Sequence, residues 1–226
     1  TMAPPSSARP RPPLPDPRDL APRLLPWFVQ HKRDMPWHGR LNPYHLFVAI
    51  FMLQQTQVAT VLPYLRRFLK AFPSVKALAA AEVDEVLRQW EGLGYYSRAR
   101  NLHRAAQTIV AEHRGRIPRT EAELRALPGF GPYTAGAVAS IALALPEPAV
   151  DGNAARVLSR LFLVDGPAQS PVVKRGLEAL AARLVDRVRP GDWNQALMEL
   201  GATLCRPRRP RCATCPLARG CAARAA

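Results

Sequence analysis

Two groups of residues in this chain have types and spacings that suit chemistry. The first begins at a glycine turn formed by Gly129 and Gly131, directly before Pro132, a residue that favours the first turn of a helix. A glycine turn that opens a helix directs backbone N–H groups outward, where they bind an anion such as a phosphate. Asp151 and Asn153 follow that helix. A phosphate-binding turn followed by a carboxylate predicts chemistry on nucleic acid, although glycine pairs between helices also form simple corners.

The second group is a set of four cysteines near the end of the chain, separated by six, two and five residues: Cys205, Cys212, Cys215 and Cys221. Four thiolates this close together hold either a tetrahedral zinc ion or an iron–sulfur cube. Structural zinc sites usually pair two close Cys-x-x-Cys halves, and this segment has one close pair. The spacing therefore favours a [4Fe-4S] cluster. Such clustering also argues against scattered disulfides, so we expect a reducing cytoplasm.

Arginines lie between and beside these cysteines, among them Arg206, Arg208 and Arg209. The chain of 226 residues carries a formal net charge of +15, mostly from arginine, which suits bidentate contacts with phosphates. We expect the arginine-rich loop to contact the DNA backbone; a solvated charged loop and a generally arginine-rich composition are the alternatives. No stretch resembles a transmembrane helix or a signal peptide, and we expect a cytoplasmic, nucleoid-associated bacterial protein.

Helices must hold these residues in place, because no segment alternates with the period of two that strands require. The fold class is therefore expected to be all-α. Residues 1–17 contain little to bury, and we expect a disordered arm there. Helix starts are predicted at Asn42–Pro43, Thr56, Thr120–Glu123, Asn153, Ser170–Pro171 and Asp192. The expected helices span about 18–32, 45–53, 56–71, 75–90, 97–115, 120–126, 132 onward, 153–163, 172–188 and 193–204.

Taken together, LPGFGPYTAG, VDGN and the cysteine spacing resemble the helix-hairpin-helix DNA glycosylases that carry an iron–sulfur cluster. Within that superfamily, MLQQTQVATV and GLGYYSRARNLHRAA resemble the adenine DNA glycosylases of the MutY type. The resemblance covers about residue 20 to the C-terminus. It implies a monomer that binds double-stranded DNA, with a mismatched or damaged base pair, in the cleft between two α-helical lobes. One lobe has six helices (36–143), and the other holds the cluster (18–35 plus 144–226).

The resemblance also implies what the site residues do. Adenine opposite 8-oxoguanine or guanine would be flipped out of the duplex and cleaved from its sugar. Residues of two turns would press into the duplex or contact it, namely Leu53, Gln54, Gln55, Thr56 and Tyr95. The turn of Gly129, Phe130 and Gly131 would bind a phosphate. For Tyr95, an ordinary core aromatic is the alternative.

The implied catalytic set lies further along the chain. Asp151 matches the carboxylate that stabilises the sugar cation, and Asn153 matches its helper. Tyr133 occupies the position where endonuclease III-type enzymes carry a lysine nucleophile. A tyrosine cannot form a Schiff base, so we expect a monofunctional glycosylase without efficient β-lyase activity. The base pocket would include Glu199, Trp37 and His38; His38 stands where the family has an arginine, and a surface carboxylate is the alternative for Glu199.

One position departs from the family in a way that matters for catalysis. The family has a glutamate three residues before the leucine of LQQT, where it acts as the catalytic acid, and this chain has Ile50. An isoleucine cannot protonate a departing adenine, and losing a positioned acid typically costs ~10²–10⁴-fold in rate. On the helix, Ile50 shares the apolar face of Leu46 and Leu53. We expect it to pack there, with catalysis impaired or altered.

Three interpretations of Ile50 stay open. The chain is an inactivated or redesigned variant, a natural paralogue that uses another group such as His38, or a non-catalytic protein that binds damaged DNA. An endonuclease III-like lyase is the least favoured function, because of Tyr133. The family usually continues beyond the cluster into a domain that reads 8-oxoguanine, whereas this chain ends five residues after Cys221. Selectivity for that partner base is therefore expected to be weak or supplied elsewhere.

Overall fold

The computed structural model describes residues 14–36, 42–167 and 170–225. These residues form helices joined by turns and loops, with no strand in the described ranges, which confirms the predicted all-α class. The expected arm at residues 1–17 lies largely outside the described residues, as do Trp37 and His38. No helix among the described residues is long and apolar enough to cross a membrane.

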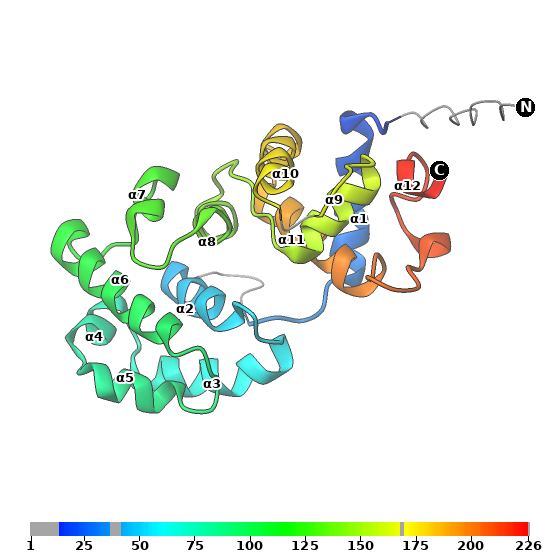
Figure 1. Cartoon of the computed structure of the whole chain (residues 1–226). Helices are drawn as coiled ribbons and strands as arrows, with labels where there is room; N and C mark the ends of the chain where they lie inside the picture. The colour runs from blue at the N-terminus through cyan, green and yellow to red at the C-terminus, as the bar shows by residue number, and fades with distance from the viewer. Residues whose placement is uncertain (1–13, 37–41, 168–169, 226) are drawn as a thin grey trace, which may run out of the picture.

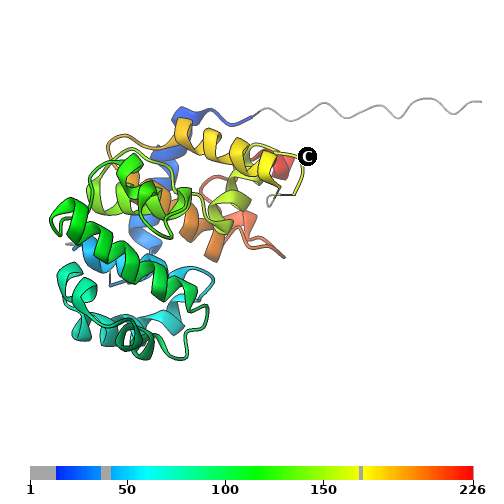
Figure 2. The same cartoon turned by 60° about the vertical axis from the view of Figure 1, so that its left-hand side comes forward.

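The helices fall into two groups that lie side by side in both views (Figures 1 and 2). The first group runs from α2 to α8, and its helices are α2 (Pro43–Leu53), α3 (Val58–Ala71), α4 (Val75–Ala80), α5 (Val83–Trp90), α6 (Ser97–His113), α7 (Glu121–Ala126) and α8 (Pro132–Ala137), which continues into a π-helical turn (Val138–Ala142). The second group contains α1 (Leu20–His31), α9 (Gly152–Leu161), α10 (Pro171–Leu184), α11 (Pro190–Thr203) and α12 (Ala222–Ala225).

Each group buries its own apolar core. The first core is built around α2, from which every residue between Leu46 and Met52 is buried. The second core combines buried side chains of α1, α9, α10 and α11, in which α1 packs against α11, and Phe28 and Trp193 are among its largest buried side chains. The lobe boundaries given above remain a prediction. What matters for function is that residues between the two cores come from distant parts of the sequence.

The capping signals located some helix starts and missed others. The Asn42 side chain accepts from the Tyr44 N–H at 2.9 Å, Thr120 and Glu123 form a full capping box, and Ser170 caps α10. These three predictions are confirmed. The prediction of one helix over 75–90 is wrong, because extended backbone at Ala81 divides it into α4 and α5. The break lets both short helices turn apolar faces onto the same core.

Three other predicted starts are wrong by one to three residues. Gln57, rather than Thr56, precedes α3, because the Thr56 hydroxyl donates instead to the Gln54 carbonyl. Asp151, rather than Asn153, caps α9 by accepting from the Ala154 N–H at 2.7 Å. The eleventh helix begins at Pro190 rather than near Asp192, because proline suits the first helical turn.

Candidate active site

A cavity of about 600 Å³ lies where the two groups of helices meet. Its lining comes from the segment after α1, from α2 and the turn that follows it, and from α8, α9 and α11. The cavity brings together eight of the residues singled out in the sequence: Ile50, Leu53, Gln55, Thr56, Tyr133, Asp151, Asn153 and Glu199. Residues up to about 150 positions apart in the chain therefore face one space of the size that binds a small ligand.

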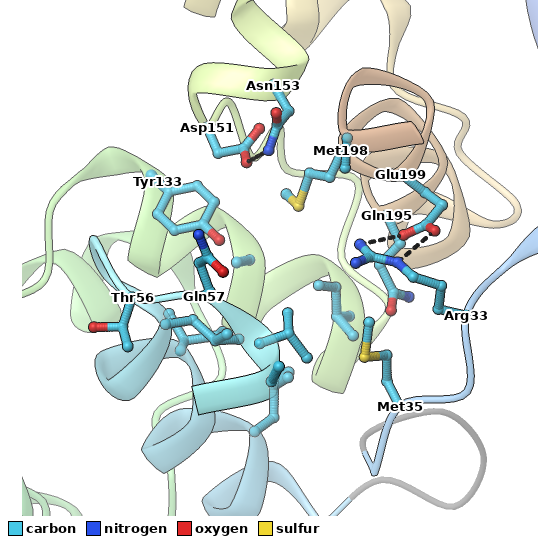
Figure 3. Close-up of a pocket in the computed structure, with 18 of the residues that line it drawn as sticks. Arg33, Met35, Thr56, Gln57, Tyr133, Asp151, Asn153, Gln195, Met198 and Glu199 are labelled. Carbon is cyan, nitrogen blue, oxygen red and sulfur yellow. Dashed lines mark hydrogen bonds and ion pairs between the residues drawn. The ribbon is translucent and has the colours of Figure 1, made fainter. Parts of the chain in front are cut away.

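The side of the cavity formed by Tyr133, Asp151 and Asn153 is polar, and we call it the sugar-side wall (Figure 3). Asp151 is fixed because it is the N-cap of α9. One carboxylate oxygen accepts from the Ala154 N–H at 2.7 Å, and the other accepts from the Asn153 side-chain amide at 2.9 Å. The positive end of the α9 dipole favours a negative charge at this position. Asp151 is thus held as a positioned carboxylate with part of its surface in the cavity.

Arg156, which the sequence did not single out, extends this hydrogen-bond network away from the cavity. Its guanidinium donates to the Asn153 side-chain oxygen at 2.7 Å, to the Gly201 carbonyl at 2.8 Å and to the Cys205 carbonyl at 2.8 Å. These bonds connect Asp151, through Asn153 and Arg156, to the start of the cysteine segment. No motif marks Arg156 in the sequence, because its partners are backbone carbonyls that only the fold brings together.

Close packing of α9 against α11 also depends on a glycine. A Cβ atom at Gly201 would lie 2.6 Å from the Asn153 Cβ atom and 2.7 Å from the Asn153 carbonyl oxygen. Real Cβ atoms essentially never approach other atoms this closely. Any larger residue at position 201 would therefore push α9 away and displace Asn153 from Asp151.

Glu199 lies on the other side of the cavity and is paired with Arg33 (Figure 3). The Arg33 guanidinium donates to both carboxylate oxygens, at 2.7 and 2.8 Å. The Glu199 side chain is 9% exposed and that of Arg33 is 49% exposed, so the pair lies at the edge of the buried region. This bond raises the pKa of Arg33. Glu199 is therefore a buried, paired carboxylate rather than the alternative of a surface one, and Arg33 is a site residue that the sequence did not reveal.

Tyr133 lies beneath Asp151 in the cavity (Figure 3). Burial, followed by the nearby Asp151 charge, raises the pKa of the Tyr133 phenol well above its usual range. A raised phenol pKa keeps the hydroxyl neutral throughout the physiological range. The group can therefore donate or accept a hydrogen bond, but it is neither a ready proton donor nor a nucleophile.

The cavity lining also contains aliphatic side chains, and we call Leu46, Ile50, Leu53, Ala137 and Ile141 the apolar wall. Ile50 is 3% exposed and also belongs to the first core. The prediction that it packs with Leu46 and Leu53 agrees with this lining. No carboxylate lies on the apolar wall, and the lining carboxylates among the described residues are Asp151 and Glu199.

Two turns, of which the one after α2 lines the cavity, each contain an exposed residue with an unusual backbone. Gln55 follows α2 with a φ of 58°, and Tyr95 precedes α6 with a φ of 48° and is 61% exposed. Both angles lie in the left-handed region that costs energy for residues other than glycine. The exposure of Tyr95 excludes the alternative of an ordinary core aromatic.

Arg98, which was not among the residues predicted from the sequence, is buried and connects these two turns. One guanidinium nitrogen donates to the carbonyls of Phe51, Met52 and Gln54, and the other donates to those of Leu93 and Gly94. The side chain also packs against the rings of Trp90 and Tyr95. Arg98 is 7% exposed, and burial lowers its pKa. The two turns therefore form a single unit held by one buried cation.

The glycine turn between α7 and α8 has the predicted helix–turn–helix form. Gly129 has a φ of 78°, and Gly129 and Gly131 are exposed. Phe130 between them is buried, and its ring packs against Phe47 and Phe51 at centroid distances of 5.6 and 5.5 Å. The Phe130 N–H donates to the Leu127 carbonyl at 3.1 Å. The two glycines are exposed at this turn, and Phe130 anchors the turn to the core.

The four cysteines line a separate cavity of about 160 Å³. None of them forms a disulfide. Arg160 donates to the Cys205 sulfur at 3.4 Å and to the carbonyls of Arg206 and Pro207, so a cation faces the sulfurs. Within the described ranges, no three metal-ligating side chains are close enough together to hold a single metal ion. Arg208 and Arg209 are exposed in the loop between the first two cysteines, whereas Arg206 is partly buried.

The sequence and fold were compared with those of known proteins. Residues 48–183 match the HhH-GPD superfamily of base excision DNA repair proteins. The chain belongs to this superfamily. The chain is 48% identical to the human adenine DNA glycosylase over 89% of its length and 43% identical to the adenine DNA glycosylase of Mycolicibacterium smegmatis over 86%. It spans 38% of the human relative and 66% of the mycobacterial one.

The fold of this HhH-GPD protein also matches solved structures. A thermostable thymine-DNA glycosylase superposes with a TM-score of 0.83 at 26% identity, covering 92% of this chain and 96% of that one. A non-covalent endonuclease III–DNA complex gives a TM-score of 0.75 at 22% identity over 94% of this chain and 98% of that one. The all-helical HhH-GPD architecture therefore extends over nearly the whole chain, beyond the residues matched by the family.

Proposed function

We propose that the protein is a base-excision DNA N-glycosylase that removes adenine mispaired with 8-oxoguanine or guanine. The observation that carries the proposal is the cavity in which Asp151, Asn153, Tyr133 and Glu199 meet. A base buried in a duplex cannot reach such a cavity, so the nucleotide must flip out of the stack. The adenine glycosylases to which the chain is similar support adenine as the base.

Cleavage of the N-glycosidic bond leaves a cation-like sugar, which a nearby carboxylate stabilises. Asp151 supplies that charge, and Asn153 with the α9 cap fixes its position. The Arg33–Glu199 pair offers both donors and an acceptor to the edge of the flipped base. Tyr133 has no amine for a Schiff base. The expected product is therefore an abasic site in an uncut strand, which makes the enzyme monofunctional.

Binding of double-stranded DNA by a monomer uses the surfaces around the cavity. The turn of Leu53, Gln54, Gln55 and Thr56, part of which lines the cavity, and the exposed ring of Tyr95 would fill the gap that a flipped base leaves in the duplex. The exposed backbone at Gly129 and Gly131 would accept a phosphate. The exposed Arg208 and Arg209, with the partly buried Arg206, add positive charge, consistent with a net charge of +15.

The four cysteines would hold a [4Fe-4S] cluster. They line one cavity, and Arg160 donates toward the Cys205 sulfur. A cluster with four thiolates carries negative charge, which a neighbouring guanidinium favours. Its contribution here is to fix the loop of Arg206, Arg208 and Arg209 against α9.

Catalysis on adenine should be weak. The apolar wall offers Ile50 where an acid would have to stand, and losing a positioned general acid costs about 10²–10⁴-fold in rate. This same observation favours a second candidate function, a non-catalytic protein that binds mismatched or damaged DNA. The two functions differ only in whether a bond is broken after the base has flipped.

The test is single-turnover incubation with a duplex containing adenine opposite 8-oxoguanine, followed by analysis with and without alkali. A monofunctional glycosylase gives strand breaks only after alkali, and Asp151→Asn lowers their rate about 10²–10³-fold while the matched surface variant Asp84→Asn does not. Breaks without alkali would indicate a lyase and overturn the monofunctional assignment. Tight binding of the mismatch with no product from the parent or from Ile50→Glu would favour the non-catalytic protein.

A further inference from the structure

Another large cavity, of about 660 Å³, lies within the first group of helices, away from the site described above. Its lining comes from the residues before α2, the start of α4 and the segment between α6 and α7. In Figure 1, α4 and α6 lie at the end of the molecule opposite α12. The exposed Arg116 and Arg119 belong to the lining, whereas no carboxylate does among the described residues. We call this space the basic cavity.

The backbone at the end of α6 brings positive charge to this place. Arg114 and Gly115 have φ angles of 55° and 74°, in the left-handed region that ends a helix. The Gly115 N–H donates to the Ile109 carbonyl at 2.9 Å. A Cβ atom at Gly115 would lie 2.7 Å from the Lys76 Cε atom. The glycine therefore lets the exposed Lys76 side chain pack against the lining, which adds a third cation.

These three cations have no carboxylate to neutralise them within the described part of the chain. Lys76, Arg116 and Arg119 form no ion pair there. On the neighbouring α7, by contrast, Arg125 is paired with Glu121 at 3.5 Å. Like charges gathered in one place repel one another, and an anionic ligand relieves that repulsion.

The basic cavity lies at the opposite ends of α2 and α6 from the two turns assigned to DNA. Gln55 follows the end of α2 and Tyr95 precedes the start of α6, whereas the cavity is lined by residues before α2 and after α6. These helices have 11 and 17 residues, so their ends are about 16 and 25 Å apart. A ligand in the basic cavity therefore leaves both turns free for the duplex.

The lining also has an apolar part, which indicates what kind of anion fits. Pro43, Val75, Ile117 and Leu143 contribute aliphatic surface beside the two arginines. A bare phosphate would make no use of that surface, and the volume is in the range that receives a much larger ligand. A peptide with both acidic and apolar side chains uses the cations and the aliphatic surface together. Arginine suits this role because its planar fork binds carboxylates in bidentate fashion.

We propose that the basic cavity is a docking site for an acidic segment of a partner protein. Carboxylates of the segment pair with Arg116 and Arg119, and its apolar side chains contact Val75, Ile117 and Leu143. This inference goes beyond the proposed function, because it uses no residue of the glycosylase cavity and does not depend on which base is removed.

The first test measures binding of a short fluorescein-labelled peptide of alternating leucine and glutamate to the holoprotein, by fluorescence polarisation at about 0.15 M salt. The double variant Arg116→Gln/Arg119→Gln should bind it at least ~10-fold more weakly, because charge-assisted contacts are lost. The matched control Arg175→Gln/Arg183→Gln removes the same charge from exposed positions of α10 and should stay within about twofold of the parent. Thermal unfolding checks that both double variants keep the fold.

A second test locates the peptide by methyl NMR of isoleucine-labelled holoprotein. The peptide should shift the Ile117 methyl signal, since Ile117 lines the basic cavity, and leave that of Ile50 in the glycosylase cavity unchanged. A shift at Ile50 without one at Ile117 would overturn the assignment.

Other results would also overturn it. Failure of the parent to bind the peptide would do so, as would equal binding by the two double variants, which would indicate general charge attraction. Undiminished binding of a peptide with serine in place of leucine would show that the apolar lining is not used. If Arg116→Gln/Arg119→Gln lost as much affinity for undamaged duplex DNA as for the peptide, the cavity would be a DNA contact instead. None of these outcomes bears on base excision, so the proposed function stands or fails separately.

Discussion

The two walls of the cavity differ in how their residues are held in place. On the sugar-side wall, Asp151 and Asn153 are bonded to each other, to the start of α9 and, through Arg156, to the cysteine segment. On the apolar wall, the aliphatic Ile50 side chain packs into the first core from α2. This contrast supports our proposal that the cavity offers a carboxylate to the sugar while an aliphatic core residue stands where an acid would act.

A physical reason explains why the two walls can differ. Asp151 is also the cap of a helix, and losing a cap costs about 1 kcal/mol, so folding itself favours a capping residue there. Position 50 lies inside a helix with both neighbours buried, where an aliphatic residue packs at no cost to the fold. Catalysis alone would require an acid at position 50, and the fold does not.

The largest expected effect comes from substituting Asp151, the carboxylate of the sugar-side wall. Asp151→Asn should lower excision by about 10²–10³-fold, because the charge beside the sugar cation is lost. Asparagine also caps helices well, so the free energy of unfolding should change by less than about 1 kcal/mol. Single-turnover assays in the Ile50→Glu background and urea unfolding measure both quantities. Equal excision by Asp151→Asn and Asp84→Asn would remove Asp151 from the chemistry.

A smaller effect is expected from substituting Arg156, which lies outside the cavity and donates a hydrogen bond to Asn153 of the sugar-side wall. Arg156→Met removes the donor to the Asn153 side chain and to three carbonyls, and unsatisfied buried acceptors cost about 1–3 kcal/mol each. We expect excision to fall roughly tenfold, with little change in the affinity for duplex DNA. The exposed Arg88→Met serves as the matched control. If Arg156→Met loses DNA affinity but excises bound substrate normally, Arg156 does not position Asp151.

A further effect is expected from substituting Arg98, whose guanidinium connects the end of α2 to the turn that contains Tyr95. Arg98→Lys keeps a charge but lacks the planar fork that reaches several carbonyls. We expect excision to fall by about 3–10-fold, and the fluorescence rise of a flipped 2-aminopurine to slow by the same factor. A normal rate of flipping combined with slow excision would contradict a role for Arg98 in holding the two turns.

The smallest effect on excision is expected from a substitution that lowers the stability of the fold without touching the cavity. Thr120→Ala removes the capping box of α7, far from the cavity, and should lower the free energy of unfolding by about 1 kcal/mol. Because Thr120 faces no substrate, excision should stay within about twofold of the parent value. Thermal unfolding and single-turnover rates provide the measurement. A rate loss as large as that of Asp151→Asn would mean that general stability, rather than the sugar-side wall, controls excision.

The sequence predicted the fold class and much of the site because those signals are local. Capping at Asn42 and Thr120 and the absence of strand periodicity depend on neighbouring residues, and both were correct. The resemblance located Asp151, Tyr133 and Glu199, which all line the cavity. Phe130 shows the limit of a motif, because its side chain is buried in the core although the turn that contains it is exposed.

The rest could not be predicted because it depends on partners that are distant in the chain. Arg33 meets Glu199 across 166 positions, and Arg98 meets carbonyls 44 to 47 positions away. Nothing in the local sequence distinguishes these arginines from the many exposed ones. The wrong starts at Thr56 and Asn153 have the same origin, since both side chains are bonded to groups outside their predicted caps.

The central claim is that a proton donor at position 50 is the one group that the cavity needs for excision of adenine. Single-turnover excision of adenine opposite 8-oxoguanine is compared among the parent, Ile50→Glu and the uncharged control Ile50→Gln. The account predicts that Ile50→Glu is faster than the parent by about 10²–10⁴-fold and that Ile50→Gln gains nothing comparable. A parent that already cleaves as fast as Ile50→Glu would contradict it.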